Sequence, residues 1–288
     1  MSDLYVIFTM DCEAVNEFAA EGGPPDWEFS KRSIEGYCNL LNSEGFMPTL
    51  FLVPLTAEKL SSFLGNLSQT CFETALHLHP QDYGYKDYLG SYNFDMQYKM
   101  IGEAKDRFTQ ALKSEPQSFR GGNLSANDHT FPVLKELGFK QGSLSVCNRN
   151  FTRVRSNWKG GHLYPYHVSD ANRLIEGDMD FLEVPVTSDW ESIMWGGLTP
   201  LELRVEMVDA RSHGFTIRKN IKRQLDENFK APVIVVLTHN IFDYSDPLEF
   251  RTTVLKGIIK EINDCADEFD LNIKGPTLSS YHEEFDLL

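Results

Sequence analysis

The sequence predicts an α/β fold built around a curled, mostly parallel sheet, and three observations support this prediction. Short apolar runs recur along the 288 residues, and most of them end at a proline, a glycine or a polar residue. Stretches with apolar residues at helical spacing lie between several of these runs. Strands that alternate with helices are typical of βαβ units, whose strands are parallel. Seven or eight such units indicate a distorted (β/α) barrel, closed or nearly closed.

The predicted elements follow in chain order. Strands are expected at Leu4–Phe8, Thr49–Val53, Thr74–His79, Gln117–Arg120, Gly142–Val146, Phe181–Val186, Val233–Thr238 and Leu271–Lys274. Helices are expected at Ser30–Ser43, Phe94–Leu112, Asp128–Leu137, Pro200–Arg211 and Arg251–Phe269. Between them, Phe151–Asp178 has little periodicity, which indicates a long loop or a small insertion over the functional site. Because no internal repeat or linker is visible, we interpret residues 1–288 as a single domain.

The composition excludes several classes of partner and location. The net charge of -15 and the pI near 4.9 argue against binding to nucleic acid or to an anionic membrane. No apolar stretch is long enough to span a bilayer, and the N-terminus lacks the pattern of a signal peptide. The five cysteines are scattered, without a C-x-x-C pair, at Cys12, Cys38, Cys71, Cys147 and Cys265. This pattern favours a reduced compartment, so we expect a cytoplasmic protein.

Two carboxylates follow the first apolar run. Residues two apart on a strand point to the same face, so Asp11 and Glu13 should share one face at the strand's end. Taken alone, the pair could equally be two surface residues beyond a strand. Two acids at such a position could also supply a metal ligand and a general base.

Two histidines follow a later strand with the same spacing. His77 and His79 should also point to one face, just before Pro80. Imidazoles and carboxylates together form a ligand set that suits zinc or a similar divalent ion. The sequence therefore predicts a divalent metal site, most simply a zinc site, formed by Glu13, His77 and His79.

Taken in order, several segments resemble the motifs of polysaccharide deacetylases of the NodB-homology type, also called carbohydrate esterase family 4. The matching segments are Phe8–Glu13, Leu76–Pro80, Phe119–Asn123 with Asn127 and Leu137–Phe139, Leu182–Thr187, Leu237–His239 and Gly275–Leu278. They cover most of the chain, and their order is more specific than any one of them. The resemblance implies a NodB-like barrel with its chemistry at the carboxyl ends of the strands.

The resemblance also implies roles for individual residues. Asp11 stands at the place of the catalytic base, which takes a proton from a metal-activated water. Arg120 would pair with Asp11 and keep it ionised. His239 would protonate the leaving amine or alkoxide. The implied activity is that of a metal-dependent hydrolase that removes an acetyl group from an acetylated sugar or saccharide.

The sequence departs from the common family pattern at the metal ligands. Common members have two adjacent aspartates where this chain has Asp11 and Cys12, and they separate their metal histidines by three residues rather than one. Cys12 should face away from Asp11 on a strand, so we prefer Glu13 as the ligand. Asp82 or a further water could complete the coordination. An exchange of roles between Asp11 and Glu13 stays open.

Other interpretations of these residues remain. His239 could be a core-edge histidine bonded to a carbonyl, and Arg120 could be a surface residue beside a turn. His162 and His167 are expected to be loop or substrate-wall residues rather than ligands. A second function within the fold is hydrolysis of a C–N bond in a small cyclic amide, as in allantoinase-like relatives. A third is a catalytically inactive barrel that binds a saccharide.

Overall fold

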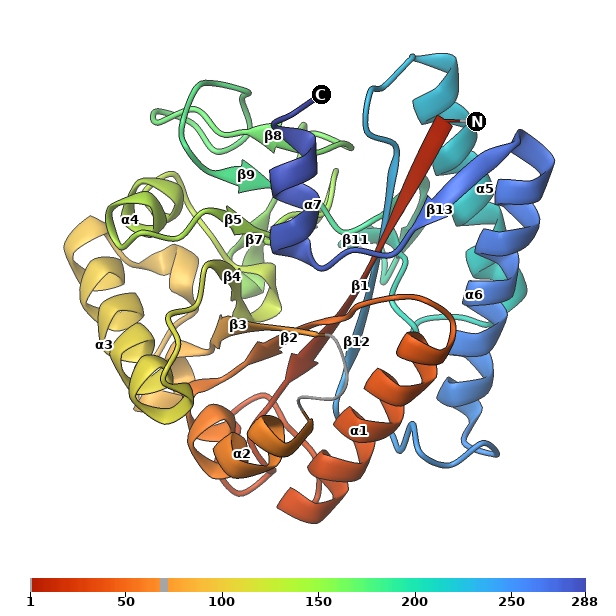
Figure 1. Cartoon of the computed structure of the whole chain (residues 1–288). Helices are drawn as coiled ribbons and strands as arrows, with labels where there is room; N and C mark the ends of the chain where they lie inside the picture. Colours follow the sequence, from red (N-terminus) through yellow and green to blue (C-terminus); the bar gives the residue numbers. More distant parts are fainter. Residues whose placement is uncertain (1, 68–71) are drawn as a thin grey trace.

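The computed structural model describes residues 2–67 and 72–288, so Cys71 lies outside the described residues. One curled sheet forms its centre (Figure 1), with the strand order β12-β1-β2-β3-β4-β5-β9-β8 and with β13 paired to the start of β1. The strands are β1 (Ser2–Cys12), β2 (Thr49–Leu52), β3 (Glu73–Leu78), β4 (Ser118–Gly121), β5 (Gln141–Gly142), β8 (Tyr166–His167), β9 (Leu182–Glu183), β12 (Val233–His239) and β13 (Leu271–Lys274). Apart from β8, which is antiparallel to β9, all of these pairs are parallel. The predicted α/β class with a barrel-like parallel sheet is confirmed.

The barrel is distorted because one side is joined by irregular chain. The backbone N–H of Thr187 donates to the carbonyl of Val235 (3.2 Å), and Leu237 exchanges hydrogen bonds with the segment around Leu203 and Val205 (3.0 Å each). These bonds connect the chain beyond β9 to β12. The sheet therefore curls back toward its first edge without a regular strand at the junction.

Two predicted strands are much shorter than expected, and Glu183 supplies the reason. We expected strands at Gly142–Val146 and Phe181–Val186, whereas β5 and β9 contain two residues each. The backbone N–H groups of Leu144 and Ser145 donate to the Glu183 carboxylate (2.9 and 2.8 Å). A buried side chain thus takes the donors that would otherwise have extended the ladder.

Helices cover the outside of the sheet (Figure 1). They are α1 (Trp27–Ser43), α2 (Pro54–Asn66), α3 (Phe94–Leu112), α4 (Thr130–Glu136), α5 (Ala210–Asp226) and α6 (Phe250–Phe269), while α7 (Leu278–Phe285) lies across one end of the barrel. Four predicted helices coincide with α1, α3, α4 and α6, while α2 and α7 were not predicted. Pro54 was interpreted as the end of a strand, but it occupies the first turn of α2, where a proline is tolerated.

The predicted helix at Pro200–Arg211 is wrong. Thr199–Glu202 is strand β11, antiparallel to β10 (Ser188–Met194), and the next helix begins only at Ala210. Asp209 caps that helix by accepting a hydrogen bond from the N–H of Ser212 (2.8 Å). The apolar residues in this segment pack on the barrel as a strand and its extension, so their spacing was misleading.

Alternation along β1 separates two cores. Its even-numbered residues from Leu4 to Cys12 pack against the outer helices, while Tyr5 and Ile7 point into the barrel. The inner cluster also contains Leu278 and Tyr281 of α7, so α7 closes the amino-terminal end of the barrel. The same inner face continues with Thr9 and Asp11, and the strand therefore delivers polar groups to the opposite, open end.

Among the described residues, no helix has the length and apolar character needed to cross a membrane. The interpretation of residues 1–288 as one domain, and the exclusion of nucleic acid as a partner, stay predictions.

A glycine in α1 tests how closely this helix packs on its neighbours, and a glycine in α2 serves as the control. A Cβ at Gly36 would lie 2.3 Å from the backbone nitrogen of Ser245 and 2.4 Å from the carbonyl carbon of Tyr244. We therefore expect Gly36→Ala to lower the free energy of unfolding by about 1–3 kcal/mol, as overpacking does. Gly65 in α2 has open space around it, so Gly65→Ala should raise stability by about 0.4–1 kcal/mol. Urea unfolding of both variants checks this, and equal effects would contradict the packing of α1.

Candidate active site

A pocket of about 450 Å³ opens at the carboxyl ends of the central strands. Its lining contains Asp11, Glu13, Asn16, Glu21, Gly22, Gly23, His77, His79, Asn123, Leu124, Arg204, Glu206, His239 and Ile241. Five of the six residues singled out from the sequence are in this wall. The sixth, Arg120, is fully buried directly beneath it and is bonded to Asp11. The structure thus brings together all six residues.

Three ligand atoms form a nearly regular triangle in this pocket. The Nε2 atoms of His77 and His79 are 3.1 Å apart, and Glu13 Oε1 lies 3.3 Å from the first and 3.1 Å from the second. Zinc with ligands at about 2.0–2.1 Å in tetrahedral geometry separates neighbouring ligand atoms by roughly 3.3 Å. The triangle therefore matches one face of a zinc tetrahedron, and the donor set fits the metal that the sequence predicted.

Neighbouring groups hold these ligands in place. The Nδ1 atom of His77 faces the carbonyl of Arg120 (3.0 Å), so it carries the ring proton and leaves the Nε2 lone pair directed at the triangle. The amide of Asn240 accepts from the N–H of Glu13 and donates to its carbonyl, both at 3.0 Å. A Cβ at Gly122 would lie 2.4 Å from the ring of His79, so only glycine leaves room for that imidazole.

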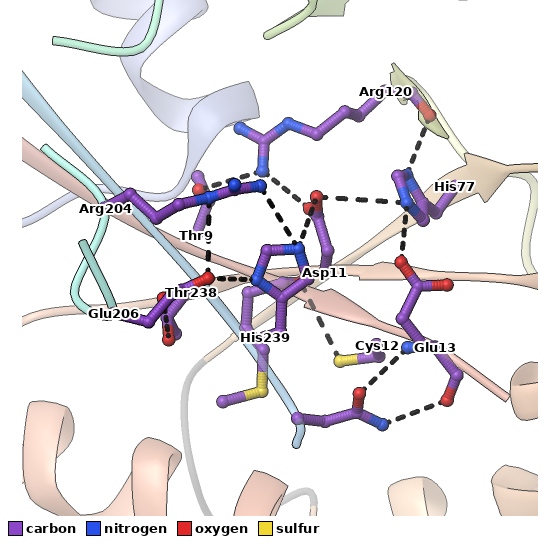
Figure 2. A network of polar contacts seen from close by, with 12 residues as sticks. Thr9, Asp11, Cys12, Glu13, His77, Arg120, Arg204, Glu206, Thr238 and His239 are labelled. Carbon is purple, nitrogen blue, oxygen red and sulfur yellow. Dashed lines mark hydrogen bonds and ion pairs between the residues drawn. The ribbon is translucent and has the colours of Figure 1, made fainter. Parts of the chain in front are cut away.

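Asp11 lies between the two sides of the pocket, as Figure 2 shows. Its Oδ1 accepts a hydrogen bond from the guanidinium of Arg120 at 2.7 Å. Its Oδ2 is 3.8 Å from the Nε2 atom of His77 and 3.9 Å from that of His239. A water-sized group beside Oδ2 would therefore be within reach of His77, of His239 and of the Asp11 carboxylate itself.

His239 is held by two residues that the sequence did not suggest. Its Nδ1 contacts Glu206 Oε1 at 2.5 Å, and its Nε2 lies 3.4 Å from an Arg204 nitrogen (Figure 2). Arg204 Nε is also 3.4 Å from Glu206 Oε1. Glu206 therefore orients the ring so that Nε2 faces the pocket, and the alternative in which His239 bonds only to a carbonyl does not describe this geometry.

The protonation of these groups follows from burial and from their neighbours. Burial alone would raise the pKa of Asp11, but the positive charge of Arg120, with contributions from His77 and His239, brings it below its usual value. Burial likewise opposes ionisation of Glu13, yet the two imidazoles lower its pKa well below the ordinary range. Both carboxylates are therefore ionised at neutral pH.

The pKa values of His79 and Glu206 are also shifted from their usual values. Burial would lower the pKa of His79, but Glu13 raises it to about 9. A metal ion at this site would displace that proton, so binding should release protons. For Glu206, burial raises the pKa, while His239 and Arg204 bring it below its usual value. Glu206 is thus a fixed negative charge beside the imidazole.

The alternative metal ligands are not in the cluster of three. Cys12 faces the helix side, where its thiol contacts the carbonyl of Met10 at 3.8 Å. Asp82 accepts a hydrogen bond from the N–H of Ala20 (2.9 Å) and shares no ligand triangle with His77 and His79. Among the described residues that meet here, Glu13 is the carboxylate in the triangle.

The segment expected over the site lies elsewhere. None of the described residues that line the pocket comes from 151–178. His162 stacks on Tyr166, with ring centroids 4.2 Å apart, and His167 lies at the far end of the barrel. Trp158 is buried and donates its Nε1–H to the carbonyl of Leu124 (2.9 Å), which supports the pocket wall from behind. We expected His162 and His167 to be loop or substrate-wall residues, and neither of them lines the pocket, so they do not form a substrate wall.

Asn240, Arg204 and Glu206 were missed for different reasons. Asn240 follows His239 directly, so its position after a strand end was a usable signal. Arg204 and Glu206 follow β11 two residues apart, so in an extended chain they point to the same face. We predicted a helix here, and in a helix residues two apart do not share a face.

Comparison with known proteins supports the fold. No family model and no curated protein matches the sequence. A protein from Mycobacterium smegmatis described as a polysaccharide deacetylase matches with a TM-score of 0.65 at 17% identity, over 98% of this chain and 90% of that one. PuuE allantoinase matches with a TM-score of 0.61 at 13% identity, over 97% and 89%. BA3943 from Bacillus anthracis, a CE4 family pseudoenzyme, matches with a TM-score of 0.51 at 10% identity, over 96% and 64%.

These similarities establish the architecture. The chain has the NodB-like fold of the polysaccharide deacetylases over nearly its whole length, as the sequence resemblance implied. At such low identities the shared fold does not assign an activity, because deacetylases, an allantoinase and a pseudoenzyme share it.

The fit of His79 against Gly122 can be tested directly. Gly122→Ala should push the imidazole out of the triangle and weaken zinc binding by about 10–100-fold, the usual effect of disturbing a group that supports a ligand. Gly102→Ala, in α3, should leave zinc affinity unchanged, because its nearest neighbour atom is at an ordinary 3.7 Å. Competition titration with a zinc chelator measures both, and unchanged affinity in Gly122→Ala would contradict the ligand role of His79.

Proposed function

We propose that this protein is a metal-dependent hydrolase that removes an acetyl group from an acetylated sugar or saccharide. The observation that carries the proposal is the arrangement around Asp11. An ionised carboxylate lies between a triangle of metal-ligand atoms and an imidazole that is held by a carboxylate. Glu13, His77 and His79 would hold a divalent ion, most simply zinc. When bound, such an ion lowers the pKa of a water molecule and polarises a carbonyl oxygen.

The chain's own residues supply the proton transfers. Asp11 accepts a proton from the attacking water, whose oxygen adds to the acetyl carbonyl carbon. Arg120 keeps Asp11 ionised and fixes the direction of its Oδ2. His239 donates a proton from Nε2 to the leaving nitrogen or oxygen as its bond to the acetyl carbon breaks. Glu206 stabilises the charged imidazole before the transfer and keeps the remaining proton on Nδ1 after it.

The pocket also favours a second candidate reaction, hydrolysis of a C–N bond in a small cyclic amide. No phenylalanine, tyrosine or tryptophan is among the described residues of the pocket wall, whereas saccharide sites commonly stack sugars on aromatic rings. The guanidinium of Arg204 is in the wall and could hold an amide substrate. Both reactions use the same metal, base and acid, so the substrate distinguishes them.

The compartment is part of the proposal. Cys12, Cys38, Cys147 and Cys265 are free and buried, which suits a reduced environment. We propose a cytoplasmic location and a substrate found there, such as a nucleotide-linked or lipid-linked acetylated saccharide.

An assay with a substrate panel tests the reaction. Purified protein should release acetate from at least one N-acetyl or O-acetyl sugar, lose this activity with a chelator and regain it with zinc. Turnover of a cyclic amide such as allantoin without acetate release would favour the second candidate. A chain that binds no metal and turns over neither class would be an inactive saccharide-binding barrel.

The role of Asp11 gives a sharper test. Asp11→Asn should retain metal content but reduce turnover by at least ~10²-fold, because asparagine keeps the size yet cannot accept the proton. Glu13→Gln should instead lose metal. If Asp11→Asn loses the metal and Glu13→Gln keeps it, the two carboxylates have exchanged roles. Metal analysis beside steady-state kinetics measures both variants.

The pairing of Arg120 with Asp11 predicts a change in pH dependence. The pKa of Asp11 lies below its usual value because positive charge outweighs burial, so the base stays ionised well into the acid range. Arg120→Gln removes that charge, so burial then raises the pKa of Asp11, and the loss of activity on the acid side should move to higher pH. Arg120→Lys keeps the charge and should shift less. Profiles of kcat/KM against pH measure this, and an unmoved acid limb would contradict the base role.

A further inference from the structure

A second group of potential ligands lies at the amino-terminal end of the barrel, away from the pocket. His282 is on α7, and Asp286, four residues further on, is the C-cap of that helix with helical backbone angles, so the two side chains share a face. His167 on β8 packs against them. None of the three lines the active-site pocket. We propose that His167, His282 and Asp286 form a second zinc site, which fastens the last helix to the edge of the sheet.

The distances suit a tetrahedral ion. Nε2 of His167 is 2.9 Å from Asp286 Oδ1, and Nε2 of His282 is 3.3 Å from Asp286 Oδ2. One ligand atom from each residue can be chosen so that all lie within 4.8 Å of one another. Ligand atoms around zinc are separated by roughly 3.3 Å, so a small rotation of the Asp286 side chain, the most exposed of the three, would bring the geometry closer to that of a zinc site. Three protein ligands leave one position for water.

Both imidazoles are oriented as metal ligands are. Nδ1 of His167 faces the carbonyl of Met179 at 3.0 Å, and a carbonyl can only accept a hydrogen bond. Nδ1 of His282 faces Oε1 of Gln141 at 2.8 Å, and Gln141 donates its Nε2–H to Ser118 Oγ at 2.7 Å. Each ring thus donates a hydrogen bond from Nδ1 to an oxygen and presents Nε2 to the cluster. Zinc-bound histidines usually make such a hydrogen bond with the ring nitrogen that does not bind the metal.

The cluster is incomplete without a positive charge. Nε2 of His282 makes no hydrogen bond, although the side chain is about nine-tenths buried. With Nδ1 protonated, a neutral ring directs a lone pair at a carboxylate, and such an arrangement requires either a further proton or a cation. Lys140 lines the same surface recess as His282 and Asp286, but its ammonium group is already paired with Asp180 at 2.6 Å. A divalent ion would satisfy both lone pairs and the carboxylate together.

The site would act on stability rather than on turnover. Leu278 and Tyr281 of α7 fill the closed end of the barrel, so an ion at His282 would hold this helix in place. A metal that binds only the folded chain raises stability by mass action.

Counting bound zinc tests the proposal with protein that carries no histidine tag. Wild-type protein should bind two zinc ions per chain, and His77→Asn/His79→Asn should bind one. Adding Asp286→Asn to that double variant should remove the remaining ion or weaken it by at least about 100-fold. Asp286 is 48% exposed, so this variant should fold. Zinc should raise the Tm of the double variant and not that of the triple variant. His129→Asn, at an exposed histidine outside both clusters, serves as the control and should change neither count nor Tm.

The two sites fail independently. If the double variant binds no zinc, or if Asp286→Asn leaves its zinc binding and Tm unchanged, the second site is overturned and the cluster is a set of ion pairs. If the wild type binds one zinc that disappears in Asp286→Asn but persists in the double variant, the second site stands and the metal proposed for the active site is overturned.

Discussion

A buried arginine is the interaction on which the site depends. The Arg120 guanidinium is fully buried, bonds to Asp11 Oδ1 and to the carbonyl of Ser143, and stacks on Phe51 with 4.2 Å between the guanidinium carbon and the ring centroid. Its own carbonyl accepts from the ring of His77. One residue on β4 thus fixes both Asp11, the proposed base, and His77, a proposed metal ligand. A buried ion pair is costly to break, since removing one partner typically costs about 3–5 kcal/mol, so Asp11 is rigidly placed.

The His239 side of the pocket is assembled by different means. His239 ends β12, but its partners Arg204 and Glu206 come from irregular chain that bridges the gap in the barrel. The distortion of the barrel therefore has a functional consequence. Where a regular strand would pair completely with β12, the segment around Leu203 pairs only in part and directs two charged side chains at the imidazole. Asp11 and His239 are register partners on the neighbouring strands β1 and β12, so both side chains face the same space, each held there by different partners.

The parts that sequence predicted well depend on local rules. Two-residue spacing at a strand end placed Asp11 with Glu13 and His77 with His79, because the pleat alone determines which face they share. The shortened strands could not be predicted, since they depend on hydrogen bonds that the distant backbone N–H groups of Leu144 and Ser145 donate to the Glu183 carboxylate. Glu206 was equally out of reach, because its role needs the register between two segments that local patterns do not define.

The fold alone leaves the activity open, and the residues of this chain narrow it. A deacetylase, an allantoinase and a pseudoenzyme share the architecture, so retention of the barrel carries no information about turnover. A barrel that only binds a ligand has no need for an ionised base held by a buried arginine. It also has no need for the His239 imidazole, which Glu206 holds on the side of Asp11 away from the ligand triangle. Each of these buried charges costs desolvation energy, and together they place the proposed acid, the proposed base and the three potential ligand atoms around one space. Their joint presence, rather than the fold, is the argument for a hydrolase.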